Sequence, residues 1–235
     1  MWDNPRLLNM AAGALAGLGA VVAVFLVLHF AARSALFPLR EIELATVPSK
    51  TTSGEIEAAV RASLRANFFA LDLTRLRESV ERLPWVRRVE VRRIWPDRLQ
   101  LSIEEHVALA RWGDDALVNV YGERFAGSTD AALPTFIGPR GAEAELTRRY
   151  ASFSRIVAPL GRLERLVLSE RYAWQLRLAS GLEIMLGRDV EAGEKRLAKF
   201  VQTYSGGIDA LVPRAPYVDL RYPNGFAVRT HSVSG

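Results

Sequence analysis

The chain has 235 residues, a net charge of +5 and no cysteine, which excludes disulfides and thiolate metal sites. Lysine occurs only at Lys50, Lys195 and Lys199, and the many arginines are interspersed with Asp and Glu. This pattern favours a solvated surface of mixed charge over a nucleic-acid-binding patch.

Residues 7–32, between Arg6 and Arg33, carry no charged side chain. As a helix they would extend about 39 Å, more than the roughly 30 Å of a bilayer's hydrocarbon core. We therefore predict a retained transmembrane helix after a short tail of residues 1–6. A cleaved signal peptide is the alternative, but its apolar region is shorter. Gly13 and Gly17 are candidates for close packing against another helix in the membrane, and the flanking charges alone do not decide the orientation.

The next seventy residues predict the order strand, helix, helix, strand, strand. The first strand covers residues 39–44, and a helix begins at Ser53, which we expect to be its N-cap, and ends near Asn67. A second helix begins at Asp72 and is stopped by Pro84. Alternating valines and leucines predict a hairpin over residues 85–94 and 99–103. The helices can cover one face of this small sheet.

The second region begins near residue 107 and is predicted to be an antiparallel sheet with two helices. The predicted helices cover residues 142–160 and 190–204. The predicted strands cover residues 108–112, 116–120, 122–125, 163–168, 173–178, 182–186, 217–221 and 226–230. The whole chain is therefore expected to be an α+β protein behind a single membrane helix.

No pattern of side chains indicates catalysis or a cofactor. The three histidines, His29, His106 and His231, are far apart in the sequence and give no metal-ligand cluster and no nucleophile with its base. Glu104 and Glu105 are adjacent, so on a strand their side chains point to opposite faces. We expect no catalytic residue, no metal and no cofactor.

The terminal hairpin, residues 217–230, is the strongest candidate for a binding site. A terminal strand often lies at the edge of a sheet, where unpaired backbone groups can accept a partner's strand. Tyr222 and Phe226 would then supply specificity. An ordinary edge strand, protected by Arg221 and Arg229, fits the pattern equally well.

Several motifs resemble the FtsQ/DivIB family of bacterial cell-division proteins, over the chain from the membrane helix to Thr230. The run LPWVRRVEVRRIWPDRL, residues 83–99, resembles the family's POTRA module. The run YVDLRY at 217–222 followed by Asn224-Gly225, with WQL at 174–176 and KRLAKF at 195–200, resembles its second, β domain.

The resemblance implies a division of the chain and a place in the cell. Residues 1–6 would be a cytoplasmic tail, 7–32 the transmembrane helix, 37–106 a POTRA domain, 107–231 the β domain and 232–235 a tail. The bulk would be periplasmic, anchored in the inner membrane at the division septum. The family is a non-enzymatic scaffold that links early and late division proteins and helps control septal peptidoglycan synthesis.

The resemblance also implies partners. These are FtsB and FtsL, with FtsK, FtsW, FtsI and FtsN as further candidates, besides membrane lipid; neither a nucleic acid nor a small-molecule substrate is expected. The residues implied in contact with FtsB are Tyr217, Asp219, Arg221, Tyr222, Asn224, Gly225, Phe226, Val228 and Arg229, and Arg171 is a further candidate.

The chain departs from the family pattern in two places. The tail before the apolar run is shorter than in many relatives, and Val228-Arg229-Thr230 stands where some relatives carry an aromatic residue. The alternative function is that of a POTRA-bearing transport or outer-membrane assembly component, which would not predict the motif at 217–222. A membrane-anchored cell-wall enzyme would need a polar constellation in a cleft.

Overall fold

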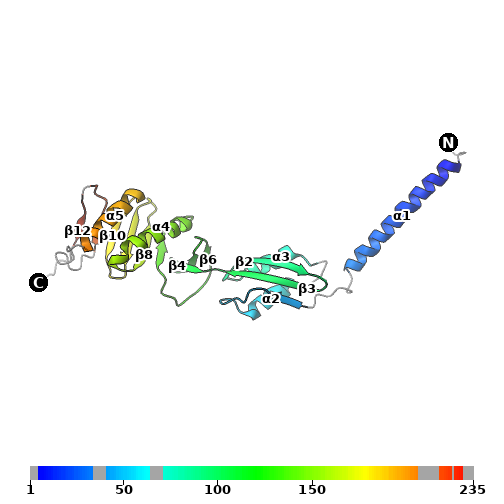
Figure 1. The fold of residues 1–235 in the computed structure, drawn as a ribbon, viewed down its shortest axis with the longest axis horizontal. Helices are drawn as coiled ribbons and strands as arrows, with labels where there is room; N and C mark the ends of the chain where they lie inside the picture. Colours follow the sequence, from blue (N-terminus) through cyan, green and yellow to red (C-terminus); the bar gives the residue numbers. More distant parts are fainter. Residues whose placement is uncertain (1–4, 34–40, 64–70, 206–216, 224, 230–235) are drawn as a thin grey trace. The chain divides into compact units, whose positions relative to one another are not determined.

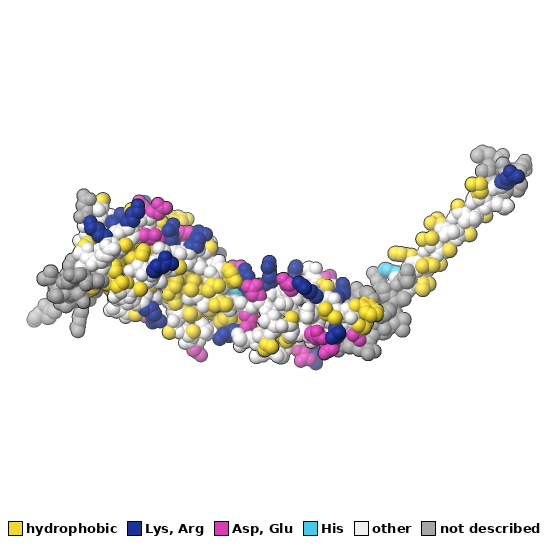
Figure 2. Space-filling view, viewed as in Figure 1, with side chains coloured by type: hydrophobic (Ala, Val, Ile, Leu, Met, Phe, Trp, Pro, Cys, Tyr) yellow, Lys and Arg dark blue, Asp and Glu magenta, His cyan; other side chains and the backbone are white. Residues whose placement is uncertain are grey.

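The computed structural model describes residues 5–33, 41–63, 71–205, 217–223 and 225–229 (Figure 1). The chain divides into two compact units, Met1–Glu105 and His106–Gly235. The first unit begins with helix α1, Pro5–Arg33, within which Asn9–Val27 is long and apolar enough to cross a membrane and is not buried by the protein. Yellow and white cover most of α1's length in Figure 2. An N-terminal apolar helix of membrane-spanning length is therefore confirmed.

The part of the first unit for which a POTRA domain was expected, residues 41–105, has the predicted order of elements. It consists of β1 (Glu41–Leu44), α2 (Ser53–Ser63), α3 (Leu73–Glu81), β2 (Val86–Ile94) and β3 (Arg98–Glu105). The sheet order is β1-β3-β2, in which β2 and β3 are antiparallel and β1 is parallel to β3. Apolar side chains of both helices and all three strands form one core.

Polar side chains cap the N-termini of both helices in this part of the first unit. At α2, Thr52 and Glu55 form a reciprocal capping box, in which Thr52 N donates to Glu55 Oε2 (2.8 Å) and Glu55 N to Thr52 Oγ1 (3.3 Å). The prediction that Ser53 is the cap is therefore wrong by one residue. At α3, Asp72, with which the second helix was predicted to begin, is the N-cap, because its carboxylate accepts from Thr74 N and Arg75 N.

The carboxylate of Glu105, at the end of β3, holds the loop that precedes α2. It accepts the backbone N–H groups of Ser49 (2.7 Å), Lys50 (2.9 Å) and Thr51 (2.7 Å) and the hydroxyl of Ser49. Burial raises the pKa of Glu105, but these hydrogen bonds outweigh it and lower the pKa to about 2. The ionised carboxylate therefore stabilises the folded POTRA domain.

We expect Glu105→Gln to lower the free energy of unfolding of the POTRA domain by about 1.5–3 kcal/mol at pH 7, the usual contribution of hydrogen bonds to a charged group. A free glutamate titrates near pH 4.3, so the wild type's advantage is complete above that pH and disappears as the pH falls towards 2. Denaturant titrations at several pH values measure this.

Glu104→Gln is the matched control for that prediction. Glu104 forms a partly exposed ion pair with Arg87 (2.7 Å), which contributes no more than about 1 kcal/mol. A loss of stability that is equal in the two variants, or that does not shrink in acid, would contradict the role given to Glu105.

The second unit is built on one nine-stranded sheet. Its elements in chain order are β4 (Ala108–Trp112), β5 (Ala116–Asn119), β6 (Arg124–Phe125), β7 (Thr135–Ile137), α4 (Glu143–Val157) with a 3₁₀ turn (Ala158–Leu160), β8 (Leu163–Leu168), β9 (Trp174–Leu178), β10 (Glu183–Gly187), α5 (Val190–Ser205), β11 (Tyr217–Asp219) and β12 (Ala227–Arg229). The sheet order is β12-β11-β10-β9-β8-β7-β4-β5-β6. The α+β class is confirmed.

The prediction that this sheet is antiparallel is wrong in part, because the sheet is mixed. Strand β7, which the sequence pattern did not predict, is parallel to both β4 and β8, and β11 is parallel to β10. The physical reason is the position of the two helices. Parallel neighbours need a long crossover, and α4 connects β7 to β8 while α5 connects β10 to β11.

The core of the second unit lies between its helices and the sheet. Helix α5 packs on β10, α4 packs on β8, and the two helices contact each other. Among the fully buried side chains, Phe153 of α4 meets Trp174 of β9 edge to face, with ring centroids 5.5 Å apart. This core, separate from that of the POTRA domain, supports β11 and β12 from the helix side.

Candidate functional site

Strand β12 is the outermost described strand at one end of the nine-stranded sheet. It is antiparallel to β11 with the pairs Tyr217–Arg229, Val218–Val228 and Asp219–Ala227, and none of the described strands pairs with its other side. Among the described residues, the open backbone edge at this end of the sheet is therefore Ala227–Arg229. Tyr217 and Asp219 lie one strand inside it, since β11 also pairs with β10.

Side chains on both faces attach β12 to the domain. Val228 packs against the core, and the ring of Phe226 meets Phe200 of α5 edge to face at 5.2 Å between centroids. On the other side, the guanidinium of Arg229 lies 5.4 Å from the ring centroid of Tyr217. A partner strand would thus meet an edge that is already held in place.

Asp219 and Arg221 form a bidentate pair where β11 ends. Arg221 Nε lies 2.9 and 3.0 Å from the two carboxylate oxygens, and Arg221 Nη2 donates to Oδ2 at 2.6 Å. The backbone N–H of Arg221 also donates to Oδ1. The Arg221 side chain lowers the pKa of Asp219 more than burial raises it, and the same contacts raise the pKa of Arg221.

The carboxylate of Asp219 also affects the pKa of Tyr217. Burial raises the pKa of its hydroxyl most, and the negative charge of Asp219 raises it further. Because Arg221 neutralises the buried Asp219, the pair holds the backbone where β11 ends without leaving an unpaired charge.

The turn after Arg221 presents the exposed aromatic side chains. Tyr222 is 55% exposed and Phe226 is 37% exposed, although Phe226 contacts Phe200 on one side. Gly225 lies in open space, with nothing within 4 Å of where a Cβ would be. Asn224 lies outside the described residues.

The register brings Arg171 to the same end of the sheet as this turn. Arg171 is exposed in the turn between β8 and β9. Trp174, which begins β9, pairs with Gly187 at the end of β10, and β10 runs parallel to β11 towards Arg221. Three of the predicted site residues, Arg171, Arg221 and Tyr222, therefore lie at one sheet end.

Tyr172, beside Arg171, lies at the same end of the sheet, and the sequence did not identify it as a candidate site residue. It is exposed and has a φ of 58°, a left-handed conformation that is uncommon for a bulky residue. The turn is held by Tyr172 N donating to Ser169 O at 2.8 Å and Ala173 N to Ser169 Oγ at 3.0 Å. No sequence signal marks a tyrosine for this conformation.

The remaining candidate residues stand apart from the hairpin. Gly13 and Gly17 lie four residues apart on α1, and apart from the neighbouring backbone of the helix itself no described atom comes within 4 Å of an added Cβ at either. Among the described residues no group of His, Asp and Glu could hold a metal ion.

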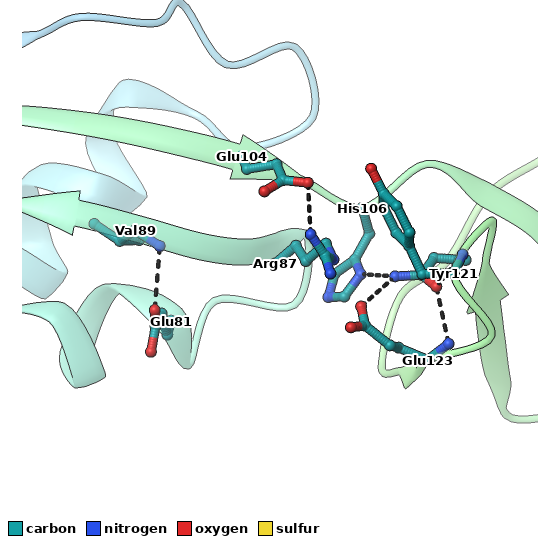
Figure 3. A network of polar contacts seen from close by, with 8 residues as sticks. Glu81, Arg87, Val89, Glu104, His106, Tyr121 and Glu123 are labelled. Atoms are coloured by element: carbon teal, nitrogen blue, oxygen red, sulfur yellow. Dashed lines mark hydrogen bonds and ion pairs between the residues drawn. The ribbon is translucent and has the colours of Figure 1, made fainter. Parts of the chain in front are cut away.

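His106 belongs to a polar network that organises the turn before β6 (Figure 3). Asn119 Nδ2 donates to Glu123 Oε2 at 2.6 Å and lies 2.9 Å from His106 Nδ1, while Asn119 Oδ1 accepts from Tyr121 N and Glu123 N. The His106 ring stacks on Phe125 at 4.1 Å. These contacts satisfy the buried Asn119 and give the network a structural role.

Comparisons with known proteins match both units. Residues 37–106 match the family model for the FtsQ-type POTRA domain, and residues 110–221 match that for the C-terminal part of cell division protein FtsQ/DivIB. Curated relatives named cell division protein FtsQ are 40% identical in Nitrosospira multiformis (97% of this chain, 99% of the relative), 38% in Burkholderia pseudomallei (97% and 94%) and 35% in Bordetella pertussis (97% and 92%).

Proposed function

Given that this chain belongs to the FtsQ/DivIB family of cell-division proteins, we propose that it acts as a non-enzymatic scaffold that accepts FtsB, paired with FtsL, at β12. Family membership points to a single-pass, non-catalytic division protein with partners in the division complex. The proposed orientation has the N-terminus in the cytoplasm and both folded units in the periplasm at the septum.

The open edge of β12 is the observation that carries this proposal. An added strand takes affinity from backbone hydrogen bonds and specificity from side chains. Ala227–Arg229 spans only about 10 Å, so few backbone bonds can form. Much of the affinity must therefore come from neighbouring side chains, and the exposed Tyr222 and Phe226 and the guanidinium of Arg221 flank this edge.

The membrane helix supports the same proposal. When α1 holds the protein in the plane of the bilayer, a partner anchored in the same membrane meets β12 at a raised effective concentration, so a contact of modest affinity is sufficient. Gly13 and Gly17 are proposed to form the packing face of α1 towards a partner's helix. FtsK, FtsW, FtsI and FtsN remain further candidate partners.

The alternative of a POTRA-bearing transport component accounts for the first unit only. The match of residues 110–221 to the FtsQ/DivIB C-terminal model favours division instead. The direct test is binding of the full-length chain in lipid nanodiscs to the FtsB–FtsL pair of the same organism. Saturable binding is expected, and no binding by folded proteins would overturn the proposal.

Gly187 tests whether the position of Arg221 matters for partner binding. Gly187 has a φ of 85°, and a Cβ there would lie 3.2 Å from Arg221 Cγ. We expect Gly187→Ala to cost about 1–2 kcal/mol of stability, because of its left-handed backbone, and to weaken FtsB binding by displacing Arg221. Titration calorimetry and thermal unfolding of the full-length protein measure the two effects.

Gly181→Ala is the matched control for this prediction. Gly181 has a φ of 89°, but nothing lies within 4 Å of an added Cβ. Gly181→Ala should lower the stability by about as much as Gly187→Ala does and leave the affinity for FtsB unchanged. Equal affinities for the two variants would show that the position of Arg221 does not contribute to the interface.

A further inference from the structure

The closed end of the β2–β3 hairpin presents an unusual exposed side chain, Trp95. Trp95 follows the last residue of β2, and its side chain is 76% exposed. By contrast Trp85, just before β2 at the other end of the strand, is partly buried, and the Lys50 ammonium lies 5.6 Å from its ring centroid. Exposure of so large an aromatic ring to water is unfavourable, so we expect this side chain to have a less polar environment.

The strand register places Trp95 at the end of the POTRA domain where the chain arrives from α1. Strand β1 is parallel to β3, and its first residue, Glu41, pairs with Arg98, the first residue of β3. Trp95 precedes Arg98 by three residues in the hairpin turn. The tip and the start of β1 are therefore neighbours, as the POTRA sheet in Figure 1 shows.

The length of the chain limits how far this end can lie from the membrane. Helix α1 ends at Arg33, six residues or about 9 Å of helix beyond the apolar stretch Asn9–Val27, which is long enough to cross a headgroup layer. Only seven residues, 34–40, separate Arg33 from Glu41. Even fully extended they reach at most about 25 Å.

We propose that Trp95 docks the tip of the POTRA domain into the interfacial layer of the membrane that α1 spans. Tryptophan is enriched at membrane interfaces, because its ring is apolar while its N–H group can remain hydrogen-bonded at the headgroup level. The short connection limits the distance between the start of β1, beside the tip, and the end of α1 to about 25 Å. The contact would fix which end of the POTRA domain faces the bilayer, and it does not depend on the binding of FtsB.

The charges around the tip indicate that the contact depends on the aromatic ring and not on attraction to anionic headgroups. Arg98 is paired with Glu43, Arg92 lies 3.3 Å from Glu90, and Arg93 donates to the backbone carbonyl of Leu71. Glu41 is exposed beside them. Because Glu43 and Glu90 balance Arg98 and Arg92, and Glu41 adds a further negative charge, the docking should persist on bilayers of neutral lipid.

The test measures quenching of tryptophan fluorescence in the full-length protein reconstituted in phosphatidylcholine bilayers brominated at a shallow acyl position. The wild type and Trp95→Ala share four other tryptophans, so the difference between them reports Trp95. We expect the wild type to show a quenched component that Trp95→Ala loses. Equal quenching of the two proteins, or quenching that requires anionic lipid, would overturn the proposal.

The double variant Trp95→Ala/Val47→Trp is the matched control, because it moves the tryptophan to the opposite end of the same domain. Val47 is 89% exposed, and its loop is fixed at the end of β3 by Ser49 N donating to Glu105. The moved tryptophan should show no lipid quenching. Quenching as strong as that of Trp95 would mean that the domain adsorbs without orientation, and the proposal would fail.

Discussion

Phe226→Glu is expected to weaken binding of FtsB by about 30-fold or more, and Tyr222→Ala by a similar factor. Aromatic side chains at the centre of an interface typically contribute 2 kcal/mol or more, which corresponds to a factor of about 30. Phe226 borders the open edge of β12 with its ring supported by Phe200. A carboxylate there would have to lose its hydration when a partner strand is added, and it would lose the apolar contact with Phe200.

Tyr121→Ala is the matched control for Tyr222→Ala. Tyr121 is also an exposed tyrosine, but it lies in the turn before β6, the strand at the opposite end of the sheet. Its removal should leave the affinity unchanged. Thermal unfolding of each variant separates loss of binding from loss of structure. Wild-type affinity of a folded Phe226→Glu variant would contradict the assignment of the site to this hairpin.

Phe136→Ala is expected to cost the second unit about 3–5 kcal/mol of unfolding free energy, the usual cost of truncating a fully buried phenylalanine. Phe136 is completely buried in β7, and its ring centroid lies 5.2 Å from that of Tyr150 of α4. Strand β7 joins β4 to β8 by parallel pairing, so the cavity would lie where the two parts of the sheet meet.

Leu101→Ala makes the reciprocal change in the POTRA core, where Leu101 is also completely buried. Since the two cores are separate, each variant should lower protection from hydrogen exchange in its own unit and leave the other unit unchanged. Denaturant titration of the full-length protein, read by exchange in each unit, measures this. A joint loss of protection in both units would contradict the separation of the cores.

The sequence predicted long or strongly periodic elements well. Helix α1 follows from an uncharged run, and the hairpin of β2 and β3 from alternating apolar residues such as Val89, Leu99 and Leu101, all of which are buried. Strand β7 was missed because three residues between Pro134 and Gly138 are too few to show a period of two. Without β7, the parallel pairs that make the sheet mixed could not be inferred.

The sequence predicted that the terminal hairpin lies at a sheet edge, but it did not predict the contacts within this candidate site. A terminal hairpin suggested an edge strand, yet the pattern could not show that, among the described residues, Ala227–Arg229 forms this edge while Tyr217 lies one strand inside. The packing of Arg221 against Gly187 joins residues 34 positions apart in the sequence, and the left-handed Tyr172 has no local signature. Such contacts depend on the tertiary register.

The most direct test of the scaffold account is hydrogen–deuterium exchange of the full-length protein in nanodiscs, with and without the FtsB–FtsL pair. Addition of a partner strand to β12 predicts new protection of the backbone amides in Ala227–Arg229, because the open edge becomes hydrogen-bonded. Binding of FtsB–FtsL with protection elsewhere and none in Ala227–Arg229 would contradict the account and place the partner on another surface.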